Sequence, residues 1–110
     1  MILTSFNICG LARGNKHNSL RRLFDVVRLE IVLIQETMTE ADKACLYFLR
    51  LFSGREVSAT DSIGRSGGLL CIWNPSSCDL IPYSSSTGIL LVGRIRGYKE
   101  LVKIWNIYGP

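Results

Sequence analysis

Apolar and polar positions follow three different patterns in the first third of the chain. Residues 2–9, ILTSFNIC, are rich in β-forming side chains and partly alternate, which predicts a strand. Residues 19–29 carry Leu20, Leu23, Phe24 and Val27 at helical spacing, with charged side chains on the other side, which predicts an amphipathic helix. Residues 31–34, IVLI, are apolar throughout, as in a parallel strand that is covered on both faces. Together these segments predict a βαβ unit.

The rest of the chain predicts one more helix and several short strands. Thr39 followed by Asp42 resembles a capping box, and Gly54 is suited to ending the helix that starts there. The expected buried stripe of this helix is Cys45, Phe48, Leu49 and Phe52. Turn-forming sequences then separate strands expected near residues 69–73, 79–83, 89–95 and 101–108. The pattern predicts an α/β fold with two helices on one face of one mixed sheet of about six strands.

The predicted βαβ unit brings two polar residues to one rim of the sheet. Its strands run parallel through a right-handed crossover, so their carboxyl ends lie at the same edge. Asn7 and Glu36 stand at those ends, where ligands bind in open α/β sheets. The alternative is that Asn7 caps a loop and Glu36 faces water at a strand end.

Composition and charge narrow the class of protein. The chain has 110 residues, 47% of them apolar and 20% charged, which indicates a single globular domain over residues 1–110. The formal net charge is +4, and Arg13, Lys16, Arg21 and Arg22 follow one another with no acid between them. Such a basic strip attracts phosphate, including nucleic acid, although it is equally compatible with a solvated loop and helix face.

Several functional classes are disfavoured. No apolar run approaches the roughly 18 residues of a membrane span, and no basic segment precedes the apolar N-terminus as in a secretory signal, so an intracellular protein is expected. Four widely spaced cysteines and a single histidine argue against a zinc site. The sequence GRSGG at 64–68 is no Walker motif. It would suit either a phosphate contact through Arg65 and Ser66 or a turn that needs positive φ.

Four stretches, in order, carry a resemblance to a known family. SFNICGL, IVLIQET, GRSGGLLCIW and WNIYGP resemble successive N-terminal motifs of the endonuclease/exonuclease/phosphatase superfamily. Their order and intervals resemble the endonuclease domain of plant LINE-type retrotransposons, and the resemblance covers nearly the whole chain. It implies the N-terminal half of a four-layer αββα sandwich (DNase I-like) and phosphodiester hydrolysis with Mg²⁺ or Mn²⁺. It also implies DNA as the partner and action in the nucleus.

The resemblance assigns roles to individual residues. Asn7 matches an amide that hydrogen-bonds near the scissile phosphate, Glu36 matches the carboxylate that binds Mg²⁺, and Tyr108 matches a tyrosine that steadies the phosphate. Arg65 and Ser66 fall in a loop similar to one that follows the DNA backbone. These residue types suit the chemistry, because Mg²⁺ prefers hard oxygen ligands such as carboxylates and phosphates.

The sequence also departs from the family pattern. Phe6 replaces a tryptophan and Met38 a lysine, and residues 1–110 contain neither the Gly-Asp-Phe-Asn motif nor the Ser-Asp-His motif of the family's second half. The expectation is therefore a fragment that is inactive alone, whose sheet lacks the cover of a second sheet and whose partner is the missing C-terminal half. Two alternatives are a fragment of another phosphoesterase, such as a nucleotide or lipid phosphatase, and a nucleic-acid-binding remnant without catalysis.

Overall fold

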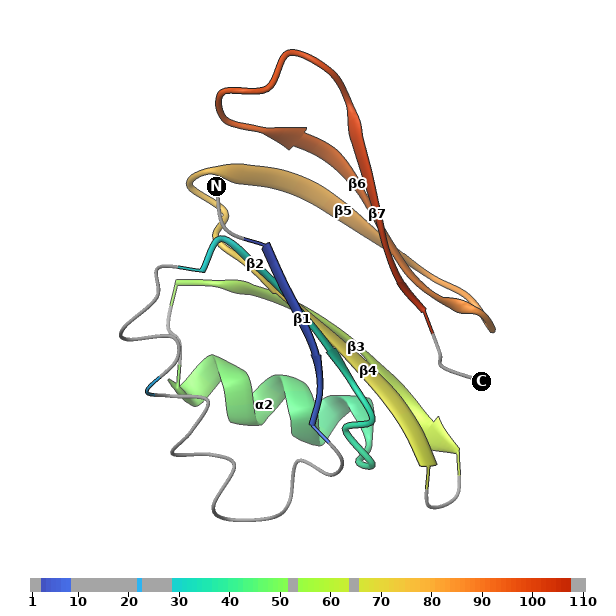
Figure 1. The fold of residues 1–110 in the computed structure, drawn as a ribbon. Helices are drawn as coiled ribbons and strands as arrows, with labels where there is room; N and C mark the ends of the chain where they lie inside the picture. Colours follow the sequence, from blue (N-terminus) through green and yellow to red (C-terminus); the bar gives the residue numbers. More distant parts are fainter. Residues whose placement is uncertain (1–2, 9–21, 23–28, 52–53, 64–65, 108–110) are drawn as a thin grey trace.

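The computed structural model describes residues 3–8, 22, 29–51, 54–63 and 66–107. In this part of the chain, seven strands form two stacked sheets, and one helix packs against the first of them (Figure 1). The elements, in order, are β1 (Leu3–Asn7), β2 (Ile31–Gln35), α2 (Ala41–Leu51), β3 (Glu56–Ile63), β4 (Ser66–Trp73), β5 (Cys78–Ser84), β6 (Gly88–Ile95) and β7 (Val102–Ile107). Figure 1 shows α2 on the outer side of the first sheet and β5, β6 and β7 on the opposite side. The order of layers is thus helix, sheet, sheet.

The first sheet contains the predicted parallel pair. Its strand order is β1-β2-β4-β3, with β1 and β2 parallel and the other neighbours antiparallel. Asn7 lies opposite Gln35, so the two parallel strands end at the same edge of the sheet. The predicted helix at 19–29 falls mainly outside the described residues.

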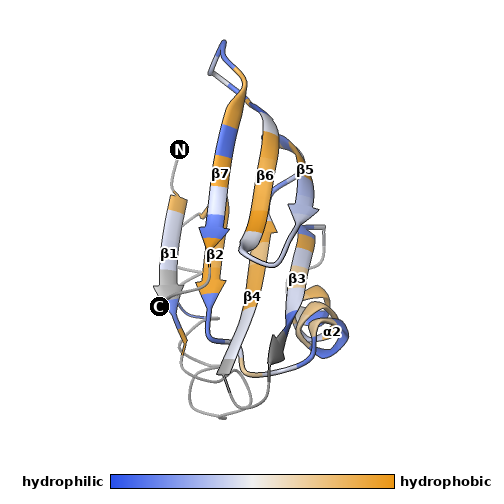
Figure 2. Ribbon diagram, turned by 90° about the vertical axis from the view of Figure 1, so that its right-hand side faces the viewer, coloured by the Kyte–Doolittle hydropathy of each residue, from blue (hydrophilic) through white to orange (hydrophobic). Residues whose placement is uncertain are grey.

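The central strand β2 is buried on both faces, as its uninterrupted apolar sequence predicts. Val32 and Ile34 face the side of α2 and pack with Phe48. Ile31 and Leu33 alternate with them and pack on the other side, against the second sheet. Figure 2 shows the same hydrophobic character along β2, β4 and β6.

The sequence predicted one mixed sheet of about six strands, and this number of sheets is wrong. Strands β5, β6 and β7 form a separate antiparallel sheet. Both edges of β4 are already paired, with β2 and β3, so the strand that follows it has no place beside it. The turn after β4, in which Ser77 and Cys78 donate backbone hydrogen bonds to the carbonyl of Asn74, leads the chain into the second layer.

The second sheet covers the face that was expected to be exposed. Leu80, Ile89 and Leu91 pack in one buried cluster with Leu33 and Cys71 of the first sheet. Burial of such side chains contributes about 1.5–3 kcal/mol each, so the two layers stabilise one another. The first sheet was expected to leave the face opposite α2 uncovered, and among the described residues this face is covered by the second sheet.

Strand β3 was missed by the sequence pattern. Its sequence, EVSATDSI, is polar at most positions, because it lies at the edge of the sheet and only part of its surface is buried. Val57 and Ala59 pack partly against the cluster beneath α2. An edge strand of this kind lacks the apolar run that made β2 easy to recognise.

Helix α2 is present where the sequence predicts it, but its buried stripe is rotated. Ala44 and Phe48 are buried and Tyr47 packs against the same cluster, whereas Leu49 is 49% exposed. Cys45 is half-buried, and burial raises the pKa of its thiol, with Asp42 adding to the effect. In the part of the chain that the structure describes, no helix has the length and apolar character needed to cross a bilayer.

Candidate functional site

The ends of β1, β2 and β7 enclose a cleft of about 310 Å³. Its lining consists of Ser5, Asn7, Gln35, Glu36, Trp105, Asn106 and Ile107. Ser5, Asn7 and Gln35 lie on the parallel pair of the first sheet, Glu36 directly follows β2, and the last three lie on β7 of the second sheet. Asn7 and Glu36, which the sequence analysis brought to one rim, thus line the same cleft.

Glu36 occupies an unusual backbone conformation directly after β2. Its φ is 58° and that of Met38 is 54°, in the left-handed region that few non-glycine residues adopt. Gly67 holds this turn, because its N–H donates to Glu36 Oε2 at 3.2 Å and its carbonyl accepts from the Met38 N–H at 2.9 Å. Such conformations persist where the surrounding structure supports them, and they concentrate at functional sites.

Gly68 gives the turn the space it needs. The Thr37 N–H donates to the Gly68 carbonyl at 3.2 Å, and a Cβ atom at Gly68 would overlap with Thr37 Oγ1. Gly67 and Gly68 have φ values of 84° and 86°. Positive φ is thus found at two glycines of the GRSGG sequence, both within β4, while Gly64 and Arg65 lie outside the described residues, so both interpretations of this sequence stay open.

An amide network joins the strands that border the cleft. Gln35 Nε2 donates to Ser5 Oγ and to Asn106 Oδ1, each at 2.9 Å. Asn106 Nδ2 donates in turn to the carbonyls of Ile34, at 3.2 Å, and Leu70, at 3.0 Å. One side chain from each of β1, β2 and β7 therefore takes part.

Asn106 was not singled out by the sequence analysis, although a signal for it exists. Val102 and Ile104 precede it at two-residue intervals, so Asn106 continues the inward face of β7. A buried amide needs hydrogen-bond partners, so an Asn at such an inward position points to a polar contact inside the molecule.

The electrostatics of the cleft are dominated by one carboxylate. Glu36 is the one ionisable side chain in the described lining. Cys71, beside Asn106, is buried, and this burial raises the pKa of its thiol to about 12 despite a hydrogen bond from Asn106. The thiol is therefore neutral at pH 7, and Glu36 supplies the charge.

The other predicted site residues are not tested. Arg13, Lys16, Arg65 and Tyr108 lie outside the described residues, and of Ser66 only the backbone is described, as the first residue of β4. The described residues contain no group of three or more His, Cys, Asp or Glu side chains suited to a metal ion. The oxygen donors that the cleft does offer include the Glu36 carboxylate and the Asn7 amide. The predicted roles of both residues stay predictions.

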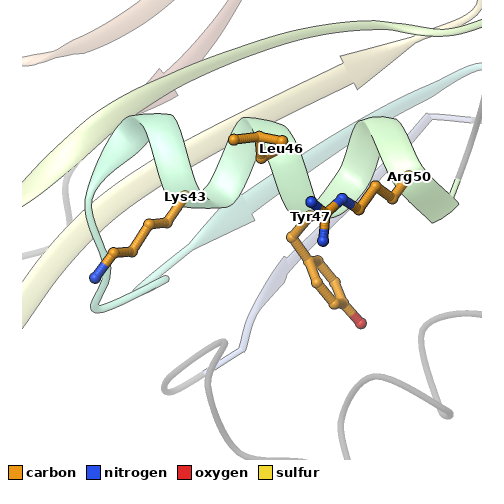
Figure 3. A pocket seen from close by; sticks show the side chains of 4 residues that line it. All are labelled: Lys43, Leu46, Tyr47 and Arg50. Carbon is orange, nitrogen blue, oxygen red and sulfur yellow. The ribbon is translucent and has the colours of Figure 1, made fainter.

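A second pocket, of about 420 Å³, lies on α2 (Figure 3). Lys43, Leu46, Tyr47 and Arg50 line it, and they come from successive turns of the helix. Among the described residues, its lining shares none with the cleft and includes neither Asn7 nor Glu36. The cleft at the strand ends is therefore the candidate site.

Comparisons with known proteins bear on the fold. No protein-family model and no curated protein sequence matches the chain. Among solved structures, the chain is similar to the AP endonuclease LMAP from Leishmania major, with a TM-score of 0.72 and 15% sequence identity. The match covers 96% of this chain and 38% of that protein, so the chain spans well under half of the endonuclease's length. At this identity the likeness establishes the fold, and it confirms the predicted class: residues 1–110 have the α+β, DNase I-like fold of that endonuclease.

Proposed function

We propose that residues 1–110 supply part of the site of a metal-dependent endonuclease that hydrolyses phosphodiester bonds in DNA, of the kind found in plant LINE-type retrotransposons. The observation that carries the proposal is the cleft that Asn7 and Glu36 line together at the carboxyl ends of two parallel strands. The fold shared with an AP endonuclease and the four sequence motifs support it. Genomic DNA as substrate implies action in the nucleus.

Glu36 suits a divalent cation. Its Oε2 accepts the hydrogen bond from Gly67, while its Oε1 has no hydrogen-bond partner in the described part of the chain. Mg²⁺ and Mn²⁺ prefer hard oxygen donors, and the Asn7 amide oxygen and the Glu36 carboxylate are of this type. When bound, such a cation polarises a phosphoryl oxygen and stabilises the leaving alkoxide.

The charge of the cleft also favours a bound divalent cation. A phosphodiester is an anion, and the described lining presents it with one negative charge and no positive one. Repulsion between like charges therefore opposes phosphate binding unless a cation lies between the phosphate and Glu36. In the proposed site, Asn7 donates a hydrogen bond to the phosphate and Tyr108 steadies it. Arg13, Lys16, Arg65 and Ser66 are proposed to contact the DNA backbone.

A comparison of DNA binding with and without metal tests this function. We expect Mn²⁺ to tighten the binding of a dye-labelled DNA duplex to residues 1–110, measured by fluorescence anisotropy at constant ionic strength. Glu36→Gln should remove this gain, whereas Glu40→Gln, on an exposed residue outside the cleft lining, should keep it. Binding that responds to salt but not to Mn²⁺ in any of these proteins would point to charge-driven binding without a metal site.

Residues 1–110 alone are proposed to be catalytically incomplete. Their single histidine, His17, has no acid among its neighbours in the sequence, and the Gly-Asp-Phe-Asn and Ser-Asp-His motifs do not occur in residues 1–110. A positioned general base contributes about 10²- to 10⁴-fold in rate, so no nicking of supercoiled plasmid is expected with Mg²⁺. Nicking by the parent that Glu36→Gln abolishes would contradict this part of the proposal.

A further inference from the structure

Asn106 is a buried amide that links the second sheet to the first. It is 1% exposed, and its strand, β7, contacts both β2 and β4. Its Nδ2 donates to the carbonyls of Ile34 on β2 and Leu70 on β4. Nδ2 also lies 3.6 Å from Cys71 Sγ, so its two hydrogens are shared among three acceptors.

The same contacts determine how Gln35 is oriented. Because Asn106 Nδ2 faces two carbonyls, Asn106 Oδ1 is left as an acceptor, and Gln35 must present its Nε2 to it. The second hydrogen of Gln35 Nε2 goes to Ser5 Oγ. The reversed amide would put oxygen against oxygen, so the network admits one orientation of each amide.

We propose that Asn106 is a positioning residue for the metal site. It holds the Gln35 side chain and thereby fixes the end of β2 from which Glu36 projects, next to β1. Gln35 directly precedes Glu36. It lies opposite Asn7 of β1, and its side chain donates a hydrogen bond to Ser5, which is also on β1. The inference rests on the proposed function, and it extends that function to a residue on the second sheet.

Residues that hold a metal ligand in place, without binding the metal themselves, support such a role. Glu36 has positive φ, a conformation that depends on its surroundings, and Gly67 bonds to its carboxylate from one side. The Asn106–Gln35 pair holds the other end of the same turn. Residues that orient metal ligands in this way typically change metal affinity by about 10- to 100-fold when they are replaced.

The test compares Mn²⁺ binding in residues 1–110 and three variants, followed by NMR broadening of the signals near Glu36. Asn106→Leu removes the amide oxygen and the amide nitrogen but keeps a side chain of similar volume. Gln35→Met removes the amide of its half-buried hydrogen-bond partner in the same way. Ile104→Ala is the matched control, because Ile104 packs on the inner face of the same strand. We expect about tenfold weaker Mn²⁺ binding in Asn106→Leu and Gln35→Met and parental affinity in Ile104→Ala. In Asn106→Leu the Gln35 side-chain NH₂ signals should also exchange faster with water.

Each outcome separates the inference from the proposed function. A parent that does not bind Mn²⁺ near Glu36 overturns the proposed function and the inference with it. Parental affinity in folded Asn106→Leu overturns the inference alone, as does an equal loss in Ile104→Ala, which would indicate general destabilisation. Should Asn106→Leu give no folded spectrum, Gln35→Met decides: parental affinity there overturns the inference, and a tenfold loss supports it.

Discussion

Gly68 shows at the level of one residue why the turn of the candidate site needs glycine. Its φ is 86°, and an added Cβ would overlap with the buried Thr37 hydroxyl. Gly68→Ala should therefore lower the free energy of unfolding by about 2–4 kcal/mol, through backbone strain and displacement of Thr37. Urea unfolding measures the loss.

The matched control for this substitution is Gly97→Ala. Gly97 has a similar φ of 91°, but nothing lies within 4 Å of the Cβ it would gain. It should lose only the cost of the left-handed conformation, about 1–2 kcal/mol. Equal losses at Gly68 and Gly97 would show that the contact with Thr37 has no energetic weight.

Individual site residues were predictable from sequence to different degrees. Asn7 lies in the first predicted strand, near its carboxyl end, and Glu36 comes shortly after the second, so parallel pairing alone brings them to one edge of the sheet. Asn106 belongs to the same cleft, but its contacts depend on the packing of one sheet on the other. The positive φ of Glu36 depends on Gly67, 31 residues away, and no local pattern reports that contact.

At the level of elements, α2 is joined to β3 by a cap that the sequence did not suggest. The first helical amide, that of Ala41, donates to Asp61 Oδ1 at 2.7 Å, although Thr39 looked like the capping residue. Asp61→Ala should cost about 0.5–2 kcal/mol of unfolding free energy, because a helix N-terminus loses its acceptor.

Two further variants make the cap measurable by urea unfolding. Asp61→Asn keeps a side-chain oxygen and should retain most of the stability. Asp79→Ala removes an exposed acid on β5 and should change little. If Asp61→Ala were no more destabilising than Asp79→Ala, the bond to Ala41 would contribute nothing to α2.

The strands were recognised more reliably than their partners. Runs such as IVLI in β2 are visible because both faces are buried, whereas the polar edge strand β3 carries no such signal. Alternation along β5, β6 and β7 indicates which face is buried but not which sheet a strand joins. With both edges of β4 occupied, β5 cannot pair beside it, and only the complete pairing reveals this.

At the level of the whole molecule, the stacking of two sheets makes the cleft. Ser5, Asn7, Gln35 and Glu36 come from one sheet, and β7 of the other sheet closes the site with Trp105, Asn106 and Ile107. A single open sheet would leave the strand ends as a flat rim. The central claim is that Glu36 binds a divalent cation in this cleft, beside Asn7.

A Mn²⁺ titration of isotope-labelled residues 1–110, followed by NMR, tests that claim most directly, because the paramagnetic ion broadens the signals of nearby nuclei. The account predicts early broadening of the Asn7 and Gln35 side-chain amides and of the Gly67 backbone amide. The amide of Gly97, in the turn at the far end of β6, should stay sharp. In Glu36→Gln the early broadening should vanish, and in the exposed-residue control Glu40→Gln it should persist. Equal broadening in the parent and in Glu36→Gln would contradict the account.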